Sequence, residues 1–238
     1  SDSILRLRGN IWMENDAIDN LFIRLFRRLI IKTVFSNINY IISVSKYLKV
    51  LCINKYPFLK KKIFVAGIHS RFKLEKKIKY PKEIKHKNIS LLTVMNFNFP
   101  GKVKGLKKFL PIFEYLNYSK KNKYQWIIAG SGNYLDDLKN FHSVKDNIHN
   151  IRFIPLSNSI KDYILNSDCL IYFSEEDILS NVIIESMSLR KIIFVNNFEP
   201  NIDAVCSFSD VILNPTKPKA EALRIESILN DFTCKNNI

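Results

Sequence analysis

The chain has 238 residues, of which 47% are hydrophobic, enough to bury one large core or two modest ones. Its formal net charge of +15 arises from 37 Lys and Arg against 22 Asp and Glu, spread along the whole length. This charge suits anionic partners such as nucleotides, polyanions or an acidic membrane surface, or else reflects a surface that is simply rich in lysine. No apolar run approaches the ~20 residues of a membrane span, so we expect a cytoplasmic globular protein.

The cysteine and histidine residues lack metal-binding spacing. The four cysteines contain no Cys-x-x-Cys pair, and Cys169 lies in an apolar, strand-like run, which indicates reduced and mostly buried thiols. The four histidines form no ligand pattern either. We therefore expect no structural metal, no cofactor and a reducing cytosol.

The first third of the chain predicts a small α/β unit over residues 1–75. "ILRLR" and "YIISVS" are typical of strands, and "KKIFVAG" of a strand that ends on Gly67. "KYLKVLCINKY" predicts a helix with Ser45 as its N-cap.

Between the first two of these strands, residues 21–32 have the spacing of an amphipathic helix. The apolar stripe consists of Leu21, Phe22, Leu25, Phe26, Leu29 and Ile30. The opposite face carries Arg24, Arg27, Arg28 and Lys32. Such a helix either packs its stripe on the core or lies on an anionic membrane surface, which would make the protein peripheral at the inner face of the membrane.

Residues 76–88 are polar and basic and contain Pro81, so they predict a linker. From residue 89 to 215, short apolar runs without period-2 alternation are separated by helical patterns. Strands of this kind are buried on both faces, as in a parallel βαβ sheet. We therefore expect an α/β fold with a doubly wound parallel sheet over 89–215, followed by a C-terminal helix over 216–238.

The stretch "SEEDILSNVIIESMS" places two acids, Asp177 and Glu185, eight positions apart. A strand is expected to end at Ser174 and a helix to begin near Ser180 and Asn181, so both acids lie at the carboxyl edge of the sheet, where such folds bind ligands. Glu185 is either a structural acid that complements the helix dipole or an acceptor for a vicinal diol such as ribose. In the second case, free N–H groups around Leu179 to Val182 would meet a phosphate.

This stretch resembles the donor-site signature of the retaining GT-B glycosyltransferases of group 1 (family 4). That signature has a Ser, two acids separated by seven residues across a turn of small residues, and a small-Met-small helix. The resemblance implies that Glu185 holds the ribose of a nucleotide sugar and that Asp177, which replaces a Glu, holds the transferred sugar. It also implies that Leu179, Ser180 and Asn181 border the donor.

Other segments follow the order of the same family. "KVKGLKKFL" resembles its Lys-Gly motif, which implies that Lys104 and Gly105 open a helix and that Lys104 stabilises the leaving diphosphate; a solvated lysine is the alternative. Phe99 stands where relatives often have an Arg, and Lys102 is the candidate substitute. The resemblance also implies donor contacts, with the turn at Gly130 and Gly132 and with the backbone around Pro155.

Upstream, "LRLRGNIWMEN" resembles the family's His-Gly segment, with Gly9 as a match and Arg8 in place of the His. The first strands of the family's N-terminal domain would precede this segment. We therefore expect a GT-B-like chain with an incomplete N-terminal α/β domain, and weak turnover or none from it.

The leading hypothesis is a glycosyltransferase, specifically a hexosyltransferase of polysaccharide or glycolipid biosynthesis. It would move a sugar from a nucleotide-sugar donor to a glycan or lipid-linked acceptor with retention of configuration. The alternative is a non-catalytic nucleotide-sugar-binding or polyanion-binding relative. Nucleic-acid binding is not expected, because the basic residues lack an RNP-like run or a helix-turn-helix pattern.

Overall fold

The computed structural model describes residues 3–8, 20–72, 88–120, 123–147, 149–156, 160–206 and 209–236. The chain divides into two compact units, Ser1–His69 and Ser70–Ile238. The predicted boundary at residue 75, most of the predicted linker 76–88, and Gly9 lie outside the described residues.

The first unit is a three-stranded parallel sheet with the order β1-β2-β3, which confirms the three predicted strands. The strands are β1 (Ile4–Leu7), β2 (Tyr40–Ser43) and β3 (Ile63–Val65), connected by α2 (Leu21–Asn37), α3 (Lys46–Lys55) and the 3-10 turn η1 (Pro57–Lys61). The Ser45 hydroxyl accepts a hydrogen bond from the Leu48 backbone N–H at 3.1 Å, so this residue is the N-cap of α3 as expected.

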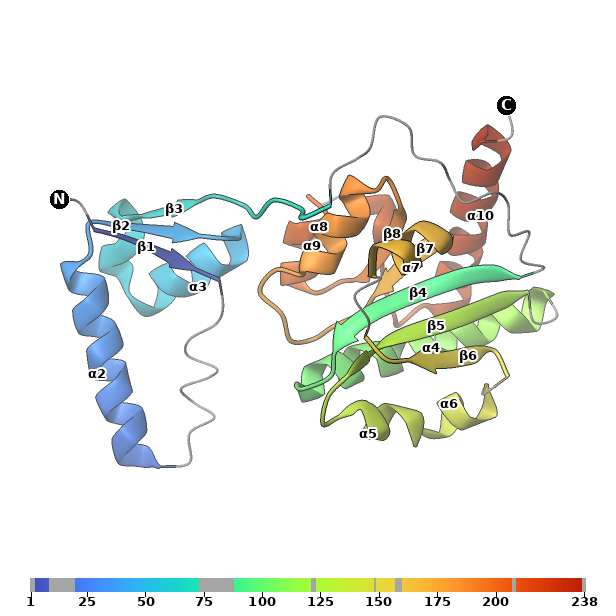
Figure 1. Ribbon diagram of the computed structural model, residues 1–238, viewed down its shortest axis with the longest axis horizontal. Helices are drawn as coiled ribbons and strands as arrows, with labels where there is room; N and C mark the ends of the chain where they lie inside the picture. Colours follow the sequence, from blue (N-terminus) through green and yellow to red (C-terminus); the bar gives the residue numbers. More distant parts are fainter. Residues whose placement is uncertain are drawn as a thin grey trace. The chain divides into compact units, whose positions relative to one another are not determined.

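Helix α2 is attached to the first unit by its C-terminal half. Phe35 is its single buried side chain and meets Tyr56 edge-on, with ring centroids 5.7 Å apart. The N-terminal half extends past the sheet (Figure 1), and the six residues of the apolar stripe are 45–79% exposed. The interpretation of residues 21–32 as a core-packed helix is therefore wrong for the chain as described, because the stripe meets no core within it.

The second unit is a six-stranded sheet in which every pair is parallel, in the order β6-β5-β4-β7-β8-β9. The strands are β4 (Ile89–Asn96), β5 (Tyr124–Ser131), β6 (Ile151–Ile154), β7 (Cys169–Tyr172), β8 (Ile192–Asn196) and β9 (Ile212–Leu213). The first three strands extend the sheet in one direction and the last three in the other. The order therefore reverses between β4 and β7, and ligands bind doubly wound folds at such a point.

The predicted alternation of strands and helices is confirmed (Figure 1). The helices are α4 (Pro100–Lys120), α5 (Leu135–Lys139), α6 (His142–Asp146), α7 (Ile160–Asn166), α8 (Asn181–Ser188), α9 (Glu199–Ala204), the 3-10 turn η2 (Ser209–Val211) and α10 (Pro218–Asn236). Helix α10 packs against α4. The short elements α6, α9 and β9 were not predicted.

Aromatic side chains fill the core next to the point of reversal. Phe109 of α4 lies with its ring centroid 5.0 Å from that of Trp126 and 5.1 Å from that of Phe173. The Trp126 indole donates to the Thr93 hydroxyl at 2.9 Å, which donates to the Ile171 carbonyl at 2.8 Å. These two buried hydrogen bonds connect β5, β4 and β7 and give the Trp126 indole and the Thr93 hydroxyl their partners. They hold the three strands in fixed positions beneath the candidate site.

Candidate functional site

The start of α4 lies directly against the end of β7. A Cβ atom on Gly105 would lie 2.5 Å from both the Phe173 carbonyl oxygen and the Ser174 Cα, a distance that real Cβ atoms do not reach. The glycine therefore permits the close approach of helix and strand end. It explains the "KG" pair by packing and brings the first turn of α4 to the acids that follow β7.

Two acids after β7 hold this first turn. The Glu176 carboxylate accepts a hydrogen bond from the Gly101 N–H at 2.9 Å, and the Glu175 N–H donates to the Gly101 carbonyl at 3.0 Å. Glu175 also forms an ion pair with Lys108, about two turns further along α4. An acid at a helix N-terminus satisfies a free backbone donor and complements the helix dipole.

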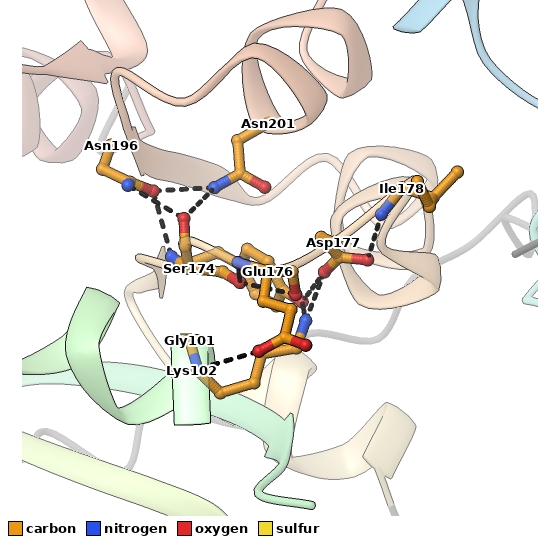
Figure 2. Close-up of polar contacts among 9 residues, drawn as sticks. Gly101, Lys102, Ser174, Glu176, Asp177, Ile178, Asn196 and Asn201 are labelled. Atoms are coloured by element: carbon orange, nitrogen blue, oxygen red, sulfur yellow. Dashed lines mark hydrogen bonds and ion pairs between the residues drawn. The ribbon is translucent and has the colours of Figure 1, made fainter. Parts of the chain in front are cut away.

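The third acid, Asp177, is the centre of a buried cluster (Figure 2). Its Oδ2 atom accepts hydrogen bonds from the Lys102 ammonium and the Tyr172 hydroxyl, and its Oδ1 atom accepts from the Ile178 N–H at 2.9 Å. Lys102 also donates to the Tyr172 oxygen at 2.8 Å. Burial, followed by the charge and hydrogen bond of Asp177, raises the pKa of Tyr172 well above its ordinary value. Tyr172 therefore stays neutral, and its hydroxyl donates a hydrogen bond to the carboxylate.

The helix that carries Lys102 and Lys104 begins earlier than predicted. Lys104 was expected to open the helix, but α4 begins at Pro100, so Lys104 and Gly105 lie in its second turn. Lys104 is exposed, whereas Lys102 is 8% exposed and contacts Asp177. Residues two apart on a helix point to different sides, so only one of the two can face the strand end. The structure brings Lys102, not Lys104, to the acids.

Two asparagines fix the backbone at Ser174, where β7 leads into the acidic loop (Figure 2). The Asn196 side chain accepts from the Ser174 N–H at 3.0 Å and donates to the Ser174 carbonyl at 2.9 Å. The Asn201 amide donates to the Asn196 side-chain oxygen at 2.7 Å. All three residues are buried. This arrangement limits the freedom of the loop that positions Asp177.

Helix α8 begins at Asn181, as predicted, and its N-cap is Ser180, whose side chain makes no capping hydrogen bond. Leu179 is half-buried, Ser180 is buried and Asn181 is exposed. The first N–H groups of α8 therefore point to the edge of the sheet without a side-chain cap. This is the arrangement in which a helix start receives an anion.

Glu185 lies in the second turn of α8 and is 4% exposed. This position excludes the interpretation as a first-turn acid that complements the helix dipole, because the dipole effect is confined to the first turn. Its carboxylate forms an ion pair with Arg71, with 2.5 Å between the Arg71 Nε and the Glu185 Oε1 atoms. A buried carboxylate at this edge of the sheet, with a single cationic partner among the described residues, is the strongest feature of the site.

The glycines at the end of β5 and just after it lie against the end of β4 and the loop that leads to α4. A Cβ on Gly130 would lie 2.4 Å from the Met95 carbonyl oxygen, and one on Gly132 would lie 2.4 Å from the Phe97 carbonyl carbon. Gly132 also has a φ of +141°, which favours glycine. Both glycines are therefore explained by close packing at this edge. Pro155 is exposed just after β6, at the same edge of the sheet.

Sequence reasoning missed six residues of this site, namely Arg71, Tyr172, Glu175, Glu176, Asn196 and Asn201. A polar residue at or beside the carboxyl end of a buried strand was the available signal for Tyr172 and Asn196. No local signal marks Arg71, since its partner is 114 residues away. Arg8 lies at the end of β1 in the first unit and is exposed.

Two absences can be stated for the part of the chain that the structure describes. No group of three or more His, Cys, Asp or Glu residues there could hold a metal ion. Among the same residues, no helix is both long and apolar enough to cross a membrane.

Known proteins resemble the chain in sequence and in fold. The family pattern of glycosyl transferases group 1 matches residues 64–237. A viral protein described as a putative glycosyltransferase, ORF31 (isolate Australia/Victoria), is 28% identical over 127 residues, which are 52% of this chain and 39% of the viral one.

Solved structures share the fold at low identity. TarM superposes with a TM-score of 0.70 at 12% identity, covering 97% of this chain and 44% of TarM. Anabaena HepE in complex with UDP and glucose superposes with a TM-score of 0.71 at 13% identity, covering 98% of this chain and 63% of HepE. WaaG, a glycosyltransferase involved in lipopolysaccharide biosynthesis, superposes with a TM-score of 0.67 at 12% identity, covering 93% of this chain and 65% of WaaG. The chain thus spans about two fifths to two thirds of the length of these relatives. Its parallel sheets and their order are those of the GT-B fold, and with a family pattern that covers most of its length, the chain belongs to the glycosyl transferases group 1.

Proposed function

We propose that this chain binds a nucleotide sugar at the point where the sheet order reverses and serves a glycosyltransferase reaction. The observation that carries the proposal is the buried carboxylate of Glu185, one turn inside α8 and behind its uncapped start. A carboxylate accepts hydrogen bonds from a vicinal diol, and free N–H groups at a helix start donate hydrogen bonds to a phosphate, so the pair suits a nucleoside diphosphate. The complex of HepE with UDP and glucose supports this class of ligand.

Residue roles follow from this assignment. Glu185 accepts hydrogen bonds from the ribose hydroxyls. The backbone N–H groups of Leu179, Ser180 and Asn181 donate hydrogen bonds to the diphosphate. Lys102 directs two of its three N–H donors at Tyr172 and Asp177, which leaves one donor and its charge for the leaving diphosphate. Asp177 then orients Lys102 as well as bordering the transferred sugar. Lys104 has a weaker case, because it is exposed.

The finer features of the reaction rest on family membership. We propose a hexosyl transfer that retains anomeric configuration, needs no metal, and uses a glycan or lipid-linked acceptor. The lipopolysaccharide role of WaaG supports such an acceptor. The configuration of the product, read by NMR of the anomeric proton, tests retention, and activity in the presence of EDTA tests the metal requirement.

The binding proposal is tested by screening nucleotide sugars and nucleoside diphosphates for thermal stabilisation, since a ligand of the folded state raises its stability by mass action. Glu185→Gln should weaken the best ligand about tenfold or more, because a charge-assisted acceptor contributes roughly 1.5–3 kcal/mol. Glu199→Gln on α9, also in this unit but exposed, is the matched control. A folded Glu185→Gln protein with wild-type affinity contradicts the ribose role.

One observation favours a second function, a non-catalytic nucleotide-sugar-binding relative. Both oxygens of Asp177 already accept hydrogen bonds from within the chain, two at Oδ2 and one at Oδ1, so a sugar finds one lone pair, on Oδ1, unless a bond is exchanged. Asp177→Ala separates the two functions: it should lower turnover of the donor far more than affinity for the free nucleotide in an enzyme. In a binding protein, turnover is absent from the start.

The exposed face of α2 supports a peripheral membrane role at the inner face. The described helix has no acid among its 17 residues and combines exposed apolar side chains with Arg24, Arg27 and Arg28. We expect the protein to sediment with vesicles that contain anionic lipid but not with neutral ones, and less so as salt rises. Mutating the three arginines to Gln should abolish this binding, whereas a wild-type protein that stays in the supernatant at low salt rejects the role.

A further inference from the structure

The three residues that begin the second unit, Ser70 to Phe72, are docked on helix α8. The hydroxyls of Ser70 and Ser188 are hydrogen-bonded at 2.8 Å, and the Ser70 hydroxyl also accepts from the Phe72 N–H at 3.0 Å. The Phe72 side chain packs against the hydrophobic core of this unit. Arg71 stands between these two anchors, with its guanidinium 5.0 Å from the Phe72 ring centroid. Its backbone is therefore fixed on both sides.

The guanidinium of Arg71 is directed at Glu185. Its Nε atom lies 2.5 Å from Oε1 and its Nη2 atom 3.5 Å from Oε2, so the two groups meet side by side. The exposures are unequal, since the Glu185 side chain is 6% exposed and that of Arg71 is 62%. A buried carboxylate needs a charge partner, and this one receives it from a solvent-facing arginine rather than from its own helix.

The pairing leaves room for a diol. Each carboxylate oxygen has two lone pairs, and Arg71 engages one on each oxygen, which leaves one on each for hydroxyl donors. Ribose hydroxyls are neutral, so a sugar that displaced Arg71 would leave the buried charge without compensation. A ribose that joins Arg71 on the carboxylate carries no such cost.

We infer that Arg71 is a positioning residue of the nucleotide site: it holds the Glu185 carboxylate turned so that its free lone pairs accept hydrogen bonds from the ribose 2′- and 3′-hydroxyls. The inference rests on the proposed function. It adds that ribose recognition depends on the segment entering the second unit as well as on α8. Arg71 then sets the preference for ribose over 2′-deoxyribose, although it touches neither sugar.

The experiment measures this preference by calorimetry with two probes, UDP and 2′-deoxy-UDP. If another nucleoside diphosphate stabilises the protein more in the thermal screen, that compound and its 2′-deoxy form replace them. The wild-type protein should bind the ribose form about tenfold or more tightly. In Arg71→Ala the affinity for the ribose form should fall to near that for the deoxy form, which itself changes little. Arg71→Lys, which keeps the charge but loses the side-by-side geometry, should lie between the two.

Controls separate positioning from other roles. Arg152→Ala, at an exposed arginine on β6, should leave both affinities unchanged. In a Glu185→Gln background, Arg71→Ala should add little, because both changes remove the same interaction. Urea unfolding verifies that each variant is folded, as expected for a side chain that is mostly exposed.

Each contrary outcome has a distinct meaning. An equal loss for both nucleotides in Arg71→Ala means that Arg71 contacts the diphosphate or supports the fold, and overturns the inference while the proposed function stands. If Arg71→Ala keeps the wild-type ratio of the affinities for the ribose and deoxyribose nucleotides, the inference is likewise overturned and the proposed function stands. Wild-type protein that binds both nucleotides equally overturns the ribose role of Glu185, and the inference with it.

Discussion

The two units differ in how firmly a helix is held against the parallel sheet. In the second unit, buried and partly buried hydrogen bonds join the start of α4, the end of β7 and the acidic loop; Asn196, Asn201 and Lys102 donate in them and Glu176 accepts. In the first unit, α2 rests on a single buried side chain, Phe35, and its apolar stripe faces outward. Buried polar groups need hydrogen-bond partners, and the resulting network fixes the positions of the elements that it joins. An uncovered apolar face constrains no neighbouring element, and it marks a surface that a partner can bind. The difference separates a region built to hold a site from a surface that is open to a partner.

The largest effect is expected for the buried ion pair. Lys102→Met leaves Asp177 without its cation, and breaking a buried pair costs about 3–5 kcal/mol; since the two side chains are 10% and 14% exposed, we expect the lower end of that range. The free energy of unfolding of the second unit, from urea titration, measures it. Lys145→Met on α6, an exposed lysine, is the control.

The double variant Lys102→Met with Asp177→Leu should recover most of this loss, because replacing both ions by apolar groups is often neutral. A Lys102→Met protein as stable as the wild type would mean that the cluster of Lys102, Tyr172 and Asp177 does not stabilise the second unit.

The next effect tests the contact between α4 and β7. Gly105→Ala places a Cβ against backbone atoms of Phe173 and Ser174, and backbone cannot yield as a side chain does. Overpacking costs about 1–3 kcal/mol and the gain in helix propensity returns up to ~1, so we expect a net loss of about 1–2 kcal/mol in the stability of the second unit.

Gly67→Ala is the matched change in the first unit, where a Cβ meets nothing within 4 Å. It should shift stability by less than about 0.5 kcal/mol. Equal effects at the two glycines would remove the contrast between the units.

A smaller effect is expected in alkaline solution. Burial raises the pKa of Cys169, so above pH 9 the unfolded thiol loses its proton while the folded one keeps it. The folded state then binds more protons, and its stability falls as pH rises, by about 1 kcal/mol for this thiol at pH 10. The unfolding free energy of the second unit, measured at pH 8 and pH 10, should fall less in Cys169→Ala than in the wild type.

Lys191 works in the opposite direction, because burial lowers its pKa and stability is regained as pH rises through the lowered value. Burial of Lys191, the largest cause, is shared by both proteins and cancels in the comparison, whereas the smaller effect of Cys169 on the pKa of Lys191 is present in the wild type alone. Identical slopes in the two proteins would show that Cys169 is not held in an apolar site.

The smallest effect is expected on α2. Phe22→Ala, at a side chain that is 79% exposed, should change the stability of the first unit by less than about 0.5 kcal/mol. The same substitution at Phe35, which is 1% exposed, should cost about 3–5 kcal/mol. A large loss at Phe22 would mean that the stripe is covered in solution.

Sequence alone predicted the sheet of the second unit well, because strands buried on both faces leave continuous apolar runs between helices. It also placed Glu185 on α8, because small polar residues mark the start of the helix that follows β7. It placed the start of α4 at Lys104, four residues late, and gave no signal that Lys102 contacts Asp177. It could not give Arg71, because pairs distant in sequence are set by tertiary packing.

The relay from Trp126 through Thr93 to Ile171 also gives the chain an optical property. The chain has two tryptophans, and Trp12 lies outside the described residues, so Trp12→Phe would leave Trp126 as the sole indole fluorophore. Its ring is fully buried and hydrogen-bonded, which gives blue-shifted emission that moves to the red when the second unit opens. Titrations with urea, alkali or nucleotide could then be followed in this unit alone, without an added dye.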